Sequence, residues 1–154
     1  MLISDLARQP HLVGQLVDAF FAEWPSWCAR VGRPAVEAIF AADPPAPLPL
    51  ILVAREGAEV RGTVALRAFF AEDPIPETPW VRQLLVLPRH RGRGVDRLLL
   101  AAVEERARAL GYERLYAATN RIERLLARRG WETFASVDHE EGPLACMTKV
   151  IRAR

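Results

Sequence analysis

One stretch, Val81 to Leu110, constrains the fold of this chain more than any other. It reads VRQLLVLPRHRGRGVDRLLLAAVEERARAL: a strand, a short loop of arginine and glycine, and an amphipathic helix that begins where the loop ends. A glycine-rich turn at a helix N-terminus presents unpaired backbone N–H groups at the positive end of the helix dipole. The stretch therefore predicts a phosphate-binding site, and the question is which phosphates it binds.

The remaining composition is that of an ordinary globular protein. A length of 154 residues predicts one domain, residues 1–154, with its own buried core. No apolar run approaches the roughly 18–20 residues that span a bilayer, and the N-terminus has no signal-peptide pattern. We therefore expect a cytoplasmic protein without a membrane partner. Cys28 and Cys146 are far apart and the three histidines are scattered, which predicts reduced thiols and no metal site.

The charge balance argues against a nucleic-acid partner, because the net charge is only +2. Lys149 is the only lysine among the 21 basic residues, so arginine is the default cation and a run of arginines carries less information than usual. A nucleic-acid binder stays an alternative, and it would use eight arginines: Arg89, Arg91, Arg93, Arg97, Arg121, Arg124, Arg128 and Arg129. It predicts an affinity that falls steeply with salt.

Hydrophobic periodicity and turn residues predict an alternation of helices and strands. Helices are expected at His11–Trp24, from about Ser26 to Ala42 with a break near Gly32, from the Arg/Gly loop to Leu110, and at Arg121–Arg129. Strands are expected at Leu48–Arg55, Val60–Phe70, Trp80–Leu87, Tyr112–Thr119, Trp131–Asp138 and Leu144–Arg152. The order predicts a mixed α/β protein built around a central βαβ unit.

Several details of these helices are also predicted. Ser26 and Asn120 are candidate N-caps, and Glu104 and Arg108 have the spacing of an exposed i,i+4 ion pair. The apolar face of the central helix is expected to consist of Val95, Leu98, Leu99, Ala102, Val103 and Leu110.

Two common phosphate loops do not fit the central stretch. A nucleotide P-loop requires Lys and Ser/Thr after its last glycine, whereas Val95 and Asp96 follow here. A dinucleotide-binding loop requires a third glycine where this chain has Arg97, and it belongs to the first βαβ unit of its fold.

A third type of loop fits better. Arg89-His90-Arg91-Gly92-Arg93-Gly94 resembles the Gln/Arg-x-x-Gly-x-Gly/Ala loop that holds the pyrophosphate of acetyl-CoA in the GNAT superfamily of N-acetyltransferases. The resemblance covers nearly the whole chain and implies an α/β fold. That fold is a mixed, mostly antiparallel sheet with a central splayed parallel strand pair, flanked by helices on both faces. The resemblance also rests on five further motifs: Leu84–Pro88, Leu98–Leu100, Arg129-Gly130-Trp131, Val60–Leu66 and Thr78-Pro79-Trp80.

The resemblance also implies how acetyl-CoA is held. Loop N–H groups and arginines would bind the phosphates, and strand backbone would pair with the pantetheine amides. Asp96 stands where a small residue is commoner, so it is expected to face solvent or to pair with Arg93 or Arg97. The implied cofactor-binding residues are Leu85, Val86, Leu87, Arg89, Arg91, Gly92, Arg93, Gly94, Val95, Asp96 and Asn120.

The implied reaction is attack of a neutral amine on the thioester, and its catalytic groups are less well defined. Many family members place a Tyr acid four residues before the Gly of the Gly-Phe/Trp motif, but this chain has Leu126 there. Tyr116 is a substitute acid, and a base would come from the loop acids Glu72, Asp73 and Glu77, through a water, or from Gln83 on the strand. The candidate catalytic residues are Glu72, Asp73, Gln83 and Tyr116.

The expected acceptor is a small-molecule or peptide amine, and the acidic loop favours a cationic one. Because of Leu126, a degenerate member that binds acyl-CoA as a sensor or interaction module is the alternative function. The C-terminal hairpin offers an edge for a homodimer.

Overall fold

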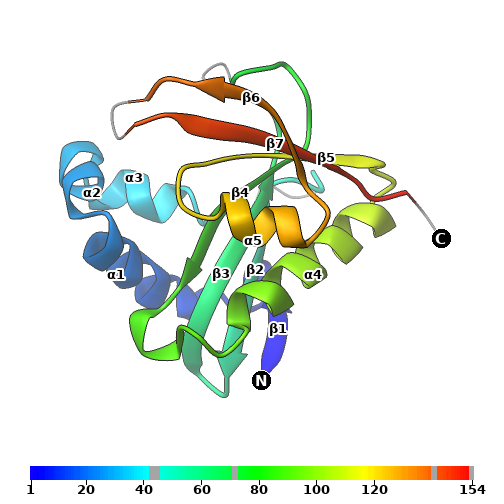
Figure 1. The fold of residues 1–154 in the computed structure, drawn as a ribbon. Helices are drawn as coiled ribbons and strands as arrows, with labels where there is room; N and C mark the ends of the chain where they lie inside the picture. Colours follow the sequence, from blue (N-terminus) through cyan, green and yellow to red (C-terminus); the bar gives the residue numbers. More distant parts are fainter. Residues whose placement is uncertain (42–45, 71–72, 140–141, 153–154) are drawn as a thin grey trace. The chain divides into compact units, whose positions relative to one another are not determined.

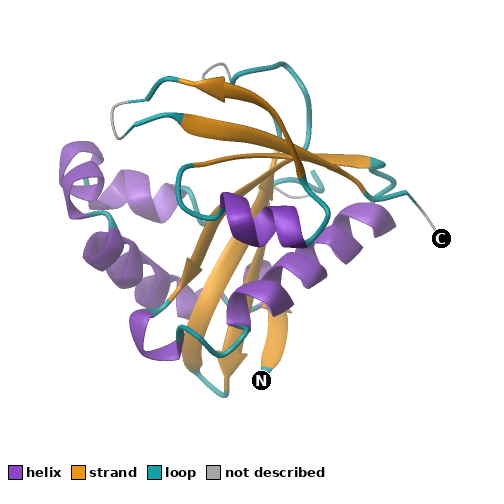
Figure 2. Ribbon diagram, viewed as in Figure 1, coloured by secondary structure: helices purple, strands orange, loops and turns teal. Residues whose placement is uncertain are grey.

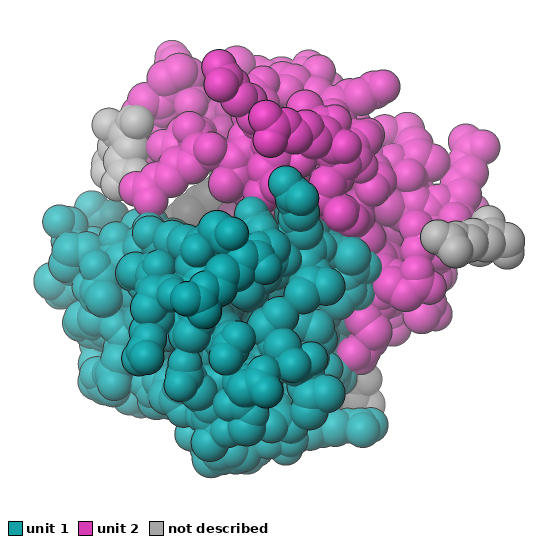
Figure 3. All heavy atoms as spheres, turned by 60° about the horizontal axis from the view of Figure 1, so that its bottom comes forward, with its two compact units in different colours: residues 1–65, 83–102 teal, residues 66–82, 103–154 magenta. Residues whose placement is uncertain are grey.

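The structure is a computed structural model that describes residues 1–41, 46–70, 73–139 and 142–152. The chain forms two compact units, which Figure 3 colours separately. Unit 1 contains residues 1–65 and 83–102, and unit 2 contains residues 66–82 and 103–154. The expectation of a single domain over residues 1–154 stays a prediction.

Among the described residues, seven strands form one mixed sheet in the order β1-β2-β3-β4-β5-β7-β6 (Figure 1). β4 and β5 run parallel, whereas the pairs β1–β2, β5–β7 and β6–β7 are antiparallel. This confirms the predicted mixed, mostly antiparallel α/β fold. The strands are β1 (Leu2–Asp5), β2 (Leu50–Glu56), β3 (Glu59–Arg67), β4 (Trp80–Val86), β5 (Arg114–Thr119), β6 (Glu132–Val137) and β7 (Leu144–Val150).

Five α-helices and three short 3-10 helices lie among the described residues (Figure 2). The second predicted helix starts one residue earlier than expected, because Pro25 takes its first position and Ser26 is not its cap. None of the helices is long and apolar enough to cross a membrane. They are η1 (Leu6–Arg8), η2 (Pro10–Leu12), α1 (Val13–Glu23), α2 (Pro25–Val31), α3 (Arg33–Ala38), η3 (Pro88–His90), α4 (Val95–Ala109) and α5 (Glu123–Arg128).

β1 was not predicted. It is a four-residue edge strand, LISD, that pairs with β2 from Leu2↔Arg55 to Asp5↔Leu52. Its side chains are only partly buried or exposed, so the sequence shows no alternation to mark it. Pairing with β2 makes it a strand, and such pairing cannot be detected from so short a segment.

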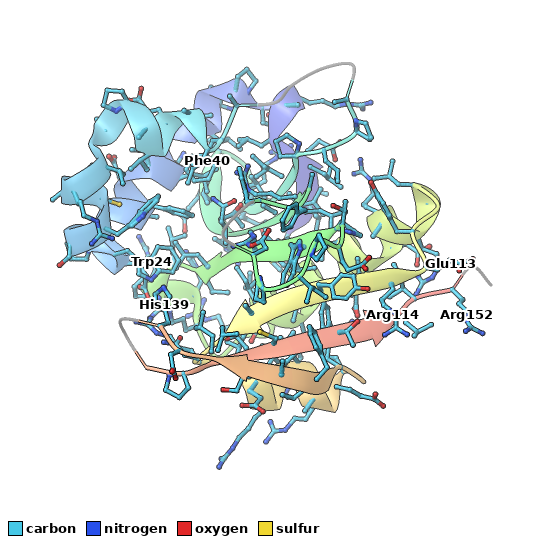
Figure 4. All side chains as sticks on the ribbon, turned by 90° about the horizontal axis from the view of Figure 1, so that it is seen from above. Trp24, Phe40, Glu113, Arg114, His139 and Arg152 are labelled. Atoms are coloured by element: carbon cyan, nitrogen blue, oxygen red, sulfur yellow. The ribbon has the colours of Figure 1, made fainter. Side chains whose placement is uncertain are left out.

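The core of unit 1 lies between α1, α3 and the sheet strands. Phe20 of α1 packs edge-to-face against Trp24 and Phe40, with ring centroids 5.0 and 4.9 Å apart (Figure 4 labels Trp24 and Phe40). The other buried residues of this core include Leu6, Leu12, Leu16, Val17, Cys28, Val36, Ile51, Val53, Val60, Ala65 and Leu85. The predicted helix His11–Trp24 forms as α1, Val13–Glu23, and supplies Leu16, Val17 and Phe20 to this core.

The predicted apolar face of α4 is partly wrong. Leu98 and Leu110 are 49% and 44% exposed, whereas Leu100 and Ala107 are fully buried. The buried residues of α4 lie mainly along one i,i+4 row. This row is rotated about the helix axis relative to the predicted apolar face. That row is Val95, Leu99, Val103 and Ala107.

The predicted Glu104–Arg108 surface pair is also wrong. Glu104 is only 3% exposed, and its carboxylate accepts hydrogen bonds from Arg129 and from Lys149, the latter at 2.5 Å. Arg108 instead pairs with Glu105 and donates to the carbonyl of Ile151. The nearby cations of β7 and of the turn after α5 outcompete the helix's own neighbour because they meet Glu104 in a buried setting, where charge pairing is stronger.

The predicted N-cap at Asn120 does not form. Helix α5 begins at Glu123, and the hydroxyl of Thr119 accepts the N–H groups of Arg121 and Ile122 at 3.1 and 3.0 Å. The Thr119 hydroxyl is therefore the acceptor for the backbone N–H groups of this turn, in place of the predicted Asn120 side chain.

Candidate functional site

The glycine loop lies between η3 and α4, and unit 1 contains η3, the loop and α4 as far as Ala102. Gly92 and Gly94 have φ values of +76° and +79°, a left-handed region that other residues adopt only with strain. No atom lies within 4 Å of the position that a Cβ would take at either glycine. The glycines thus permit both the turn and an open space over its backbone.

The loop's backbone donors are available to a ligand. Within the described ranges, no backbone acceptor is found for the N–H groups of residues 92–96. Farther into the helix, Leu98 N–H donates to Gly94 O at 3.1 Å, and Arg97 N–H donates to the Asp96 carboxylate at 2.8 Å. The Asp96 carboxylate therefore accepts a hydrogen bond from a backbone N–H at the start of α4. This contact is neither of the predicted side-chain pairs, with Arg93 or with Arg97.

The three loop arginines are not equivalent. Arg89 and Arg93 are exposed, as phosphate ligands need to be. The Arg91 guanidinium is held by two partners of its own unit: it donates to Val86 O at 2.9 Å and to Glu23 Oε2 at 2.8 Å. An anion that binds Arg91 must therefore compete with a carboxylate already in place.

His90 is a residue of this site that the sequence reasoning missed. It is 5% exposed, and its Nε2 lies 2.8 Å from Glu59 Oε1 at the start of β3. The two atoms are in close contact but are not aligned as a hydrogen bond. A histidine inside an Arg/Gly loop was the only signal for it, and the sequence could not reveal its partner.

The end of β4 before the loop has two unusual backbone features. Gln83 is the one described non-glycine residue with a positive φ, 59°, which interrupts the regular strand as a bulge does. Gly62 of β3 lies so close to β4 that a Cβ there would be 2.8 Å from Leu85 O. Leu87 N–H then donates to Arg61 O at 2.9 Å, so β3 supports the strand up to the loop.

The loop between β3 and β4, in unit 2, contains three candidate bases, of which Glu77 is exposed. Glu72 lies outside the described residues. Asp73 is buried, forms an ion pair with Arg82, and accepts the N–H of Phe70 at 2.7 Å. Burial, with a smaller contribution from the charge of Arg82, lowers the pKa of Arg67 at the end of β3 to about 10. The ion pair with Arg82 and the hydrogen bond from Phe70 show that the Asp73 carboxylate stabilises this loop.

Tyr116 lies on β5 in unit 2, opposite Trp80 of β4. Its ring is 5.5 Å from the Trp80 ring and 6.2 Å from that of Phe134. Burial raises the pKa of Tyr116, the Glu77 carboxylate adds to the shift, and Arg114 partly offsets it. The hydroxyl therefore stays protonated and can donate a proton or a hydrogen bond.

The remaining candidate positions are placed as follows. Leu126 is 1% exposed in the core of unit 2, and Asn120 is exposed just after β5. No group of three or more His, Cys, Asp or Glu that could hold a metal ion exists in the part of the chain described. Cys28 and Cys146 are free and buried, in agreement with the prediction.

This chain is an α/β protein in which an open glycine loop leads from a mixed sheet into a helix, an arrangement typical of proteins that bind phosphate-type anions. The sequence model of the Acetyltransferase (GNAT) family matches residues 14–131. This is more than half of the 154-residue chain, and the protein therefore belongs to the GNAT acetyltransferase family.

Solved structures agree with that fold. An aminoglycoside 6'-N-acetyltransferase complexed with coenzyme A has a TM-score of 0.82 at 17% identity, over 100% of this chain and 99% of that one. The aminoglycoside 6'-N-acetyltransferase from Enterococcus faecium has a TM-score of 0.79 at 17% identity, with the same coverage. A putative acetyltransferase from Salmonella typhimurium with its cofactor acetyl-CoA reaches 0.72 at 22% identity, over 100% and 95%. No curated protein matches the sequence.

Proposed function

We propose that this protein is an N-acetyltransferase that moves the acetyl group of acetyl-CoA to a primary amine by direct attack in a ternary complex. The observation that carries the proposal is the open backbone of residues 92–96, where two glycines with positive φ present unpaired N–H groups at the start of α4. Family membership supports the same reading.

The residues fit acetyl-CoA in both charge and shape. The loop donors and the exposed Arg89 and Arg93 would hold its phosphates. Arg91 would join them after exchanging Glu23 for phosphate. The backbone of residues 85–87 would pair with the amides of the pantetheine arm, and Asn120 would add a polar contact.

When bound, acetyl-CoA supplies an activated acetyl thioester. A backbone N–H near Leu85 would polarise the acetyl carbonyl. The Tyr116 hydroxyl, whose pKa is raised by burial, would serve as the proton donor in place of the missing tyrosine at Leu126. Glu72, Asp73 and Gln83 stay candidates for the base, although the ion pair with Arg82 makes Asp73 the least available of the three.

The acceptor is proposed to be a small molecule or a peptide N-terminus. Two structural neighbours are aminoglycoside acetyltransferases, which makes polycationic amines the first class to assay. Action in the cytoplasm as a single domain belongs to the same proposal. A homodimer through the β6 edge stays a prediction that the solution molecular mass tests.

The second candidate function is an acyl-CoA sensor or interaction module with little turnover. Leu126 motivates it, because this buried aliphatic side chain cannot donate a proton to a leaving thiolate. Release of free thiol from acetyl-CoA across a panel of amines separates the two functions. Tight acetyl-CoA binding without thiol release for any amine would favour the sensor.

A matched pair of loop variants tests the donor site itself. Gly94→Asn and Gly94→Asp have similar shape, and both residues tolerate a φ near the observed +79°. They differ in charge. We expect the Asp variant to bind acetyl-CoA at least about tenfold more weakly than the Asn variant, with the same melting temperature, because a carboxylate repels phosphate. Equal affinities by titration calorimetry would show that the loop does not hold the phosphates.

A further inference from the structure

Three aromatic rings form a row across unit 2, and the acetyl-CoA loop does not account for them. The row consists of Trp80, Tyr116 and Phe134, from β4, β5 and β6. Trp80 is fully buried and Tyr116 is half-buried, whereas Phe134 is 41% exposed. The row thus runs from the core to the surface.

Phe134 reaches this row through an irregularity in its strand. The β6–β7 register shifts between Thr133↔Met147 and Ala135↔Cys146, so Phe134 is the extra residue of a β-bulge. Bulges redirect a side chain. Since β7 lies between β5 and β6, the backbones of Tyr116 and Phe134 are roughly 9–10 Å apart, yet their rings approach to 6.2 Å. The two rings therefore lean toward each other over β7.

One acidic residue, Glu77, is joined to this row through its backbone. The Trp80 indole donates to Glu77 O at 2.7 Å and so anchors the backbone of Glu77. The Glu77 carboxylate acts electrostatically on the Tyr116 hydroxyl, has no ion-pair partner among the described residues, and is exposed. Asp73, the other described acid of this loop, is already paired with Arg82.

Two cations lie near the row. Arg82 lies over the Trp80 ring at 5.5 Å and is paired with Asp73. Arg114, at the start of β5 (Figure 4), donates to the hydroxyl of Thr148 at 3.1 Å and keeps its charge, but its effect on the Tyr116 hydroxyl is smaller than that of Glu77. The open part of the row is therefore the Tyr116 and Phe134 rings, and the acid Glu77 has the larger electrostatic effect on Tyr116. Aromatic faces and a carboxylate are the two groups that attract an ammonium ion.

We infer that Glu77, Tyr116 and Phe134 form the subsite that receives the ammonium group of a cationic amine acceptor. This inference rests on the proposed acetyl transfer and narrows its substrate class to amines that carry a positive charge at neutral pH. Glu77 and Phe134 are then specificity-determining residues. The subsite also gives a function to Phe134, an exposed side chain at a β-bulge that core packing does not explain.

The test compares acceptors by charge. Steady-state transfer is measured with spermidine, which is cationic, and with 4-methylaniline, which is neutral at pH 7.5. We expect Glu77→Gln to raise the KM for spermidine about three- to tenfold and Phe134→Leu to raise it about two- to fourfold. The KM values for acetyl-CoA and 4-methylaniline should stay within about twofold. Glu113→Gln, an exposed position in the turn before β5, is the charge-matched control (Figure 4).

Three results would overturn the subsite. They are an unchanged spermidine KM in both variants, an equal loss with the neutral amine, and a Phe134→Leu effect on oligomeric state without one on KM. Failure of the proposed function looks different, because then the wild-type protein releases no thiol with any amine. In that case calorimetric titration of spermidine into wild-type and Glu77→Gln protein decides, and binding that does not depend on Glu77 rejects the subsite.

Discussion

The imidazole of His90 lies 2.8 Å from the carboxylate of Glu59, which joins the short helix before the glycine loop to the first residue of β3. His90 is buried, and its backbone N–H also donates to Leu87 O at 2.9 Å. The contact fixes the entrance of the loop from the side of the sheet.

We expect loss of this contact to loosen the acetyl-CoA loop. His90→Gln and Glu59→Gln should each raise the KM for acetyl-CoA about three- to tenfold, because the loop must then be ordered on binding. The acceptor KM should not change. The double variant should resemble either single variant, since both remove the same contact. Additive effects would show that the two residues act separately.

Glu23 is expected to lower the affinity of the loop for acetyl-CoA. It neutralises Arg91 in the ligand-free structure, with Nη2 and Oε2 2.8 Å apart. Glu23→Gln should therefore lower the KM for acetyl-CoA about two- to fivefold and make binding more sensitive to salt. A higher KM would show instead that the ion pair prepares the loop for its ligand.

Glu104 is expected to be the most costly single charge to remove. Its buried carboxylate holds Arg129 and Lys149 (the only lysine of the chain). Glu104→Gln should lower the free energy of unfolding by about 3 kcal/mol, because two cations lose their partner. Glu105→Gln, which removes an exposed pair with Arg108 on the same helix, should cost less than about 1 kcal/mol in the same denaturant titration.

The buried thiols predict a loss of stability in alkali. Burial raises the pKa values of Cys28 and Cys146. Their contribution is complete below the thiol pKa of the unfolded chain, about 8.5, and is lost as the pH rises toward and through the higher folded values. The unfolding free energy should fall above about pH 9, and less so in the Cys28→Ala/Cys146→Ala variant. Thiol reagents should label the wild type only on unfolding, and fast labelling of native protein would contradict the burial.

Local signals in the sequence were strong where one segment specified its own structure. Helices α4 and α5, each followed by a glycine two residues after its end, and most of the strands begin and end within a residue or two of the predicted places. The glycine loop was predictable for the same reason, since positive φ and an open helix start depend on residues adjacent in the chain.

Partners distant in the chain were the usual source of error. The sequence suggested Arg91 as a phosphate ligand, but it could not show that Glu23 of α1 forms an ion pair with this arginine. Glu104 had an obvious helical neighbour in Arg108, but cations from β7 and from the turn after α5 reach it in a buried setting. The bulge that turns Phe134 toward Tyr116 depends on the register of β6 against β7, which no local pattern specifies.

By itself the sequence determined the glycine turn at the start of α4, the order of most elements around it and a resemblance that the family match confirms, and it predicted that the turn binds phosphate. These are properties of contiguous residues, in which backbone preference and periodicity act over a few positions. Only the tertiary structure decided which charges are already paired and which stay open to a ligand. That decision depends on burial and on side chains brought together from distant segments, because a charge pair gains its strength where water is excluded.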